Sequence, residues 1–125
     1  MNMKSRKYDL EERAIQFAVT IINVADGIPA TRAGNHIAGQ IIRAGTSPAS
    51  NYGEAQSAES KNDFIHKMKI VLKELKETRI WLRIIQCKSY CKSNEQIDDA
   101  LAECEELVRI FAKSISTASG NQEKT

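Results

Sequence analysis

Apolar residues recur every three or four positions along almost the whole of this 125-residue chain. That spacing places them on one face of an α-helix, whereas a half-buried β-strand needs strict alternation, of which the chain shows none. Only 6 glycines and 2 prolines are present, too few for a turn-rich β fold. A helical chain of this length can bury one hydrophobic core, and we therefore expect a single all-α domain.

Helix start and stop signals divide the apolar pattern into four segments. The first segment spans residues 10–28, with Asp9 and Glu12 resembling a capping box at its start and Gly27 and Pro29 ending it. The core residues that the four segments predict are Leu10, Ala14, Phe17, Ile21, Val24 and Ile28; Ile37, Ile41 and Ala44; Phe64, Met68, Val71, Leu75, Thr78, Leu82 and Ile85; and Ile97, Leu101, Cys104, Val108, Phe111 and Ile115.

Three further helices begin at hydroxyl side chains that can accept a free backbone N–H. The second starts at Thr31 and the third at Ser60, while Ser93 and Gln96 form a capping box at the start of the fourth. Short connections between four helices favour an antiparallel up-down four-helix bundle over residues 1–119. Residues 120–125 have nothing to bury and are expected to form a disordered tail.

The second helix contains residues that normally end a helix. Within residues 43–56 it holds Gly45, Pro48 and Gly53. Proline lacks the N–H that would bond the carbonyl four residues earlier, so we expect a kink near Pro48. The glycines cost helix stability but permit close packing against a neighbour.

The third helix carries more apolar surface than one bundle core needs. Besides its core stripe it has Ile70, Trp81 and Ile84 on a neighbouring face. Such a surplus predicts contact with another subunit or partner, and these three residues are our candidate oligomer interface. The alternative is that Trp81 only shields the edge of the core.

Charge is unevenly distributed, although the net charge is only +2. Residues 61–92 contain seven Lys and two Arg against three acids, whereas residues 93–125 contain three bases against seven acids. Part of the basic excess falls along one helical strip that would suit a phosphate backbone. A solvated face, or neutralisation by the acidic fourth helix, is the alternative. The candidate nucleic-acid-binding residues are Lys69, Lys73, Lys76 and Arg83.

No catalytic, cofactor or metal constellation is visible. A bundle dinuclear metal site needs paired Glu-x-x-His helices, and the nearest match is the single pair Asp63 and His66. Cys87 and Cys91 lack the further ligands of a tetrahedral site. We expect no enzyme activity, no cofactor and no metal. The lack of a membrane-length apolar run, of a signal peptide and of an even cysteine count favours a cytoplasmic protein without a membrane partner.

The run RAGTSPASNYGEAQ at residues 43–56 resembles the signature of the four helix bundle protein family. These are also called 23S rRNA intervening-sequence proteins and were formerly labelled S23 ribosomal proteins. The similarity continues through residues 60–67 and 70–78 and closes at Trp81 and Leu82. The resemblance implies a bundle that assembles as a ring, commonly a homopentamer. A relative, the accessory variability protein of diversity-generating retroelements, associates with a reverse transcriptase and nucleic acid.

The resemblance also draws attention to polar residues at the seam between the second and third helices. Asn51 and Glu54 share a face of the second helix, and we expect them to meet residues of the third. This cluster either fixes the register between helices or subunits or forms a ligand site. Its expected members are Arg43, Asn51, Glu54, Lys73 and Glu77.

Two functions therefore stand open. The first is a non-enzymatic homo-oligomeric scaffold associated with RNA, DNA or a reverse transcriptase. The second is a self-assembling protein-interaction scaffold with no role in nucleic-acid binding.

Overall fold

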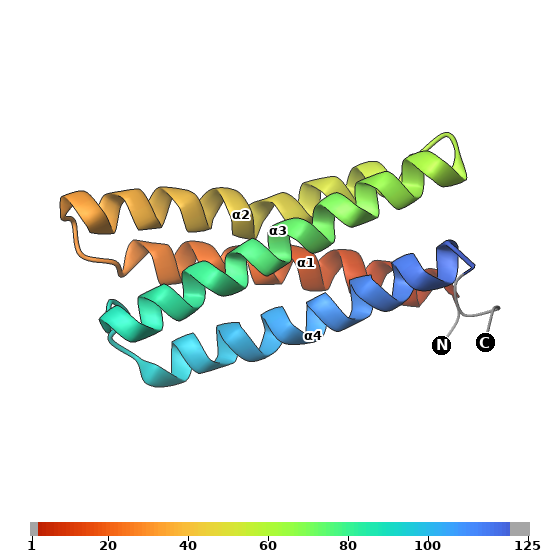
Figure 1. The fold of residues 1–125 in the computed structure, drawn as a ribbon. Helices are drawn as coiled ribbons and strands as arrows, with labels where there is room; N and C mark the ends of the chain where they lie inside the picture. The colour runs from red at the N-terminus through yellow and green to blue at the C-terminus, as the bar shows by residue number, and fades with distance from the viewer. Residues whose placement is uncertain (1–2, 121–125) are drawn as a thin grey trace.

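The computed structural model describes the backbone of residues 3–120 and the side chains of residues 9–120. Within these residues the chain forms four α-helices that run up and down in turn (Figure 1). Their bounds are α1 (Met3–Asp26), α2 (Arg32–Gln56), α3 (Lys61–Lys88) and α4 (Asn94–Ala118). The predicted all-α up-down four-helix bundle is confirmed.

The helices occupy the four corners of the bundle in chain order. α1 packs against α2 and α4, and α3 packs against the same two helices. In the described part of the chain, no Cα atom of α1 lies within 8 Å of one in α3, and none of α2 lies within 8 Å of one in α4. α1 and α3 are therefore diagonal neighbours whose outer faces point in opposite directions.

Hydroxyl caps fix three of the helix starts. Thr31, Ser60 and Ser93 are in extended conformation, and each side chain accepts a hydrogen bond from the backbone N–H three residues later. Each bond satisfies one of the free N–H groups at a helix start. The predicted starts of α2, α3 and α4 are confirmed.

Two predicted capping details are wrong. Asp9 and Glu12 lie inside α1, because the helix begins at Met3 rather than after Asp9. At the start of α4 only half of the capping box forms. The Gln96 side chain does not return to Ser93, because its carbonyl oxygen accepts a hydrogen bond from the Cys91 thiol at 3.2 Å.

The core follows the predicted stripes closely. The positions from Ala14 to Ile28, and those from Met68 to Ile85, are buried as expected, while Leu10 and Phe64 are partly buried. In α4 the buried face also includes Ala100 and Leu107, beside the partly buried Leu101 and Val108. α4 thus turns slightly away from the predicted face, because it must contact both α1 and α3.

α2 continues as one helix through Pro48, which is buried. Side chains bond the backbone on either side of it: the Thr46 hydroxyl donates to the Ile42 carbonyl, and the Asn51 amide donates to the Ser47 carbonyl. The kink near Pro48 stays a prediction. Gly45 has a clear packing reason, because a Cβ there would lie 2.6 Å from Cγ2 of Ile21.

No helix in residues 3–120 is long and apolar enough to span a membrane. The expected tail at 120–125 lies outside the described residues except for Gly120.

Candidate functional site

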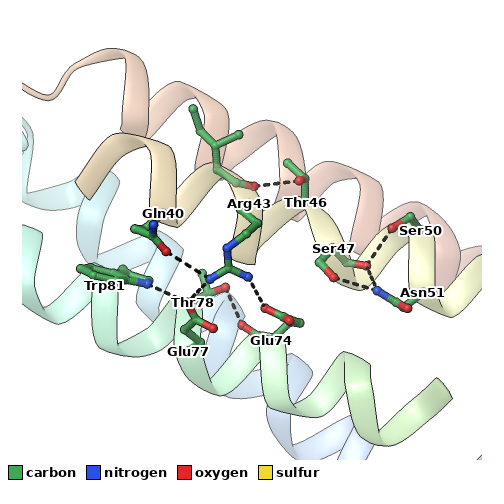
Figure 2. Close-up of polar contacts among 11 residues, drawn as sticks. Gln40, Arg43, Thr46, Ser47, Ser50, Asn51, Glu74, Glu77, Thr78 and Trp81 are labelled. Carbon is green, nitrogen blue, oxygen red and sulfur yellow. Dashed lines mark hydrogen bonds and ion pairs between the residues drawn. The ribbon is translucent and has the colours of Figure 1, made fainter. Parts of the chain in front are cut away.

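Arg43 ties α2 to α3 at the centre of the seam. Its guanidinium donates to Oε1 of Glu74 at 3.1 Å and to Oε2 of Glu77, and more weakly to Oε1 of Gln40 at 3.4 Å (Figure 2). A planar guanidinium presents five N–H donors in a rigid fork, so its two terminal nitrogens can each bond a different carboxylate. The structure thus brings together two members of the predicted seam cluster, Arg43 and Glu77.

Glu77 also holds the single tryptophan in place. Its Oε2 accepts a hydrogen bond from Nε1 of Trp81 at 3.1 Å, and the edge of the Trp81 ring meets His36 with 6.1 Å between centroids. Trp81 packs against the core and is partly buried, as are Ile70 and Ile84. The polar end of Trp81 is therefore satisfied within one chain, whatever its outer surface contacts.

The other members of the seam cluster lie apart from Arg43. Nζ of Lys67, and not Lys73, pairs with Oε1 of Glu54 at 2.6 Å. The Asn51 amide bonds Ser47 on its own helix (Figure 2). The cluster does not form as one unit because the antiparallel register brings Lys67 level with Glu54. Lys73 lies nearly two turns further along α3 and is exposed.

Within the described residues, the seam leaves no buried polar side-chain atom without a hydrogen-bond partner that a ligand could supply. Arg43 with its two carboxylates and the Lys67–Glu54 pair are sufficient to set how α2 and α3 align. This geometry favours a role in helix register.

The basic strip is defined here as Lys69, Lys73, Lys76 and Arg83. All four side chains are exposed on the outer face of α3. No ion pair joins any of them to a described acid. Four unpaired cations at one- and two-turn spacing form a row of positive charge that a polyanion can contact.

The acids of α4 do not neutralise this row. Glu103 pairs with Arg13 of α1 at 2.8 Å, and Glu105 pairs with Arg79 of α3 at 2.9 Å. Both bases lie outside the basic strip. In the described residues, the acids of α4 therefore do not neutralise the charge of the basic strip by direct ion pairing.

The sequence reasoning missed an apolar surface on α1. Ile15, Val19 and Ile22 are between 39% and 44% exposed, and Ile42 of α2 is 37% exposed. We call Ile15, Val19 and Ile22 the α1 patch. A signal was present in the sequence, because these three residues are spaced by four and three positions and form a second apolar face beside the core stripe.

The described residues hold no group of His, Cys, Asp and Glu able to bind a metal. The three cysteines differ in exposure: Cys87 is exposed, Cys91 is intermediate and Cys104 is buried. The Cys104 thiol donates to the Leu75 carbonyl at 3.3 Å, and burial raises its pKa to about 12.

This difference predicts selective thiol chemistry. At mildly alkaline pH, iodoacetamide is expected to modify Cys87 in the folded protein and to leave Cys104 unmodified, because only an accessible thiolate reacts. Peptide mapping by mass spectrometry measures each site, and a denatured sample, in which all three thiols react, is the control. Equal modification of Cys104 and Cys87 in the folded state would contradict the buried position.

The model of the 23S rRNA-intervening sequence protein family matches residues 6–113, which span all four helices. The chain belongs to this family. The resemblance drawn from residues 43–82 is thereby confirmed. No curated protein matches the chain at a significant level.

A solved structure supports the family assignment. It is a crystal structure of a protein of unknown function from the S23 ribosomal protein family of Bacteroides thetaiotaomicron VPI-5482. It is 31% identical, superposes with a TM-score of 0.78, and the match covers 85% of this chain and 97% of that chain. The family thus shows the fold and leaves the function open.

Proposed function

We propose that this 23S rRNA-intervening sequence protein is a non-enzymatic accessory scaffold that binds nucleic acid through the basic strip. The observation that supports the proposal is the absence of acidic partners for Lys69, Lys73, Lys76 and Arg83 among the described residues, while five other basic side chains there are paired. Unpaired cations in a row gain most from phosphate contacts, because neutralising a phosphate releases its condensed counterions.

Salt dependence tests this proposal. With four phosphate contacts on single-stranded RNA, affinity should fall by about 50-fold between about 50 and about 200 mM salt. Fluorescence anisotropy with a labelled RNA of generic sequence measures the affinity. Absence of binding at the lower salt concentration overturns the proposal.

A quadruple variant locates the binding surface. Replacing all four basic-strip residues by Gln should abolish the steep salt dependence and most of the affinity. A control variant that loses the same charge elsewhere should retain both. If the two variants lose affinity equally, net charge rather than the basic strip is responsible. The control residues are Lys61, Lys88, Lys92 and Lys113.

The second candidate function is a self-assembling scaffold, and the exposed α1 patch favours it. A ring-like homo-oligomer, a pentamer by family resemblance, is the assembly we propose for it. Light scattering should then give a small multiple of the 14.0 kDa chain mass. A reverse transcriptase partner is implied by resemblance alone.

A further inference from the structure

The α1 patch lies between acidic side chains. Glu11 and Glu12 stand one turn before Ile15, and Asp26 stands one turn after Ile22. All three acids are exposed, and none has an ion-pair partner within residues 9–120. The outer face of α1 is therefore an apolar surface with negative charge at both ends.

The outer face of α3 carries the opposite charge and one exposed apolar residue. Ile80 is the most exposed large apolar residue of the described chain, at 56%. Lys76 stands one turn before it and Arg83 one turn after it, and neither pairs with a described acid. The distance along the helix from Lys69 to Arg83 is 14 residues or about 21 Å, the same as from Glu12 to Asp26.

These two faces cannot meet within one molecule, because α1 and α3 occupy diagonal corners of the bundle and their outer faces point in opposite directions. They also do not suit a two-fold dimer. Such a dimer would place acids against acids or bases against bases, which repel. Contact between the α1 face of one copy and the α3 face of the next satisfies both charge and apolar surface.

We propose that the α1 patch with Glu11, Glu12 and Asp26 docks onto Ile80 and the basic strip of a second copy of this chain. The interface is heterologous, so every copy has one free face of each kind until a ring closes or a filament grows. Docking covers the basic strip. Where the proposed nucleic-acid function also holds, self-assembly and nucleic acid compete for the same cations.

A charge-swap experiment tests the docking. The first variant carries Glu11→Lys, Glu12→Lys and Asp26→Lys, and the second carries Lys73→Glu, Lys76→Glu and Arg83→Glu. Each set changes exposed side chains only. Multi-angle light scattering of nuclease-treated protein measures the mass, and circular dichroism confirms that both variants remain helical.

The wild type should have a mass of three or more chains, and each variant alone should be a monomer of 14.0 kDa. An equimolar mixture should assemble again, because each variant then offers the other a complementary face on both sides. The two variants must alternate, so a ring that closes in the mixture holds an even number of chains. A monomeric wild type, a variant that still assembles, or a mixture that stays monomeric overturns the proposal.

A measurement of RNA affinity on the same variants tests the docking and the proposed nucleic-acid function separately. The α1 variant keeps the basic strip intact and uncovered, so its RNA affinity should equal or exceed that of the wild type. If it loses assembly but neither protein binds RNA, the docking stands and the nucleic-acid function fails. If RNA binds but the mixture does not reassemble, the docking fails and the nucleic-acid function stands.

Discussion

Replacing Phe111 by Ala is expected to lower the free energy of unfolding by about 3–5 kcal/mol. Phe111 is completely buried in α4, and its ring meets the edge of Tyr52 from α2 with 5.5 Å between centroids. No Cα atoms of these two helices lie within 8 Å of each other in the described residues, so the aromatic pair spans the centre of the bundle. A domain of this kind is stable by only about 5–15 kcal/mol, and the variant should be close to unfolding.

Denaturation by urea, followed by far-UV circular dichroism, measures this effect. Lys113→Ala, at an exposed position two residues further along α4, is the matched control and should change stability by less than about 0.5 kcal/mol. If Phe111→Ala were as mild as the control, the central position of the ring in the core would be wrong.

Gly45→Ala is expected to lower the free energy of unfolding by about 1–3 kcal/mol, although alanine is the better helix former. The new Cβ would lie 2.6 to 2.9 Å from three side-chain carbons of Ile21. Real Cβ atoms do not approach so closely, so α1 and α2 must separate or Ile21 must leave its place in the core. The same denaturation experiment measures the loss.

Gly53→Ala is the matched control on the same helix. Nothing lies within 4 Å of a Cβ built at Gly53, so alanine there should raise stability by up to about 1 kcal/mol. In an Ile21→Ala background the cost of Gly45→Ala should be smaller, because Cγ1 and Cγ2 of Ile21 are gone and only its Cβ, at 2.9 Å, remains close. If alanine were tolerated equally at Gly45 and Gly53, contact of α2 with Ile21 would not be the reason for the glycine.

The polar seam shows how far residue spacing predicts a site. Arg43 and Glu77 could be placed near each other because antiparallel helices joined by a short loop must lie side by side. The partner of Glu54 could not be predicted in the same way, because Lys67 and Lys73 are both cations of α3 and differ only in their position along the helix. The register of α2 against α3 selects Lys67.

The exposed apolar residues of the structure are not those that the sequence predicted, and the reason is similar. The sequence predicted surplus apolar surface at Ile70, Trp81 and Ile84. All three are partly buried within one chain, and their contact with a second subunit stays a prediction. The α1 patch and Ile80 are more exposed, and the sequence pattern did not predict them as a surface. Exposure depends on the direction in which a neighbouring helix lies, and periodicity along a single helix does not contain that direction.

The sequence by itself determined the four helices, most of their starts and nearly all of the core, because caps and apolar periodicity act within a few residues. It also identified the family. Only the tertiary structure decided which charges pair across helices and which stay free, and that α1 and α3 face away from each other. Those outcomes depend on the register and corner positions of whole helices, which arise when all four pack together.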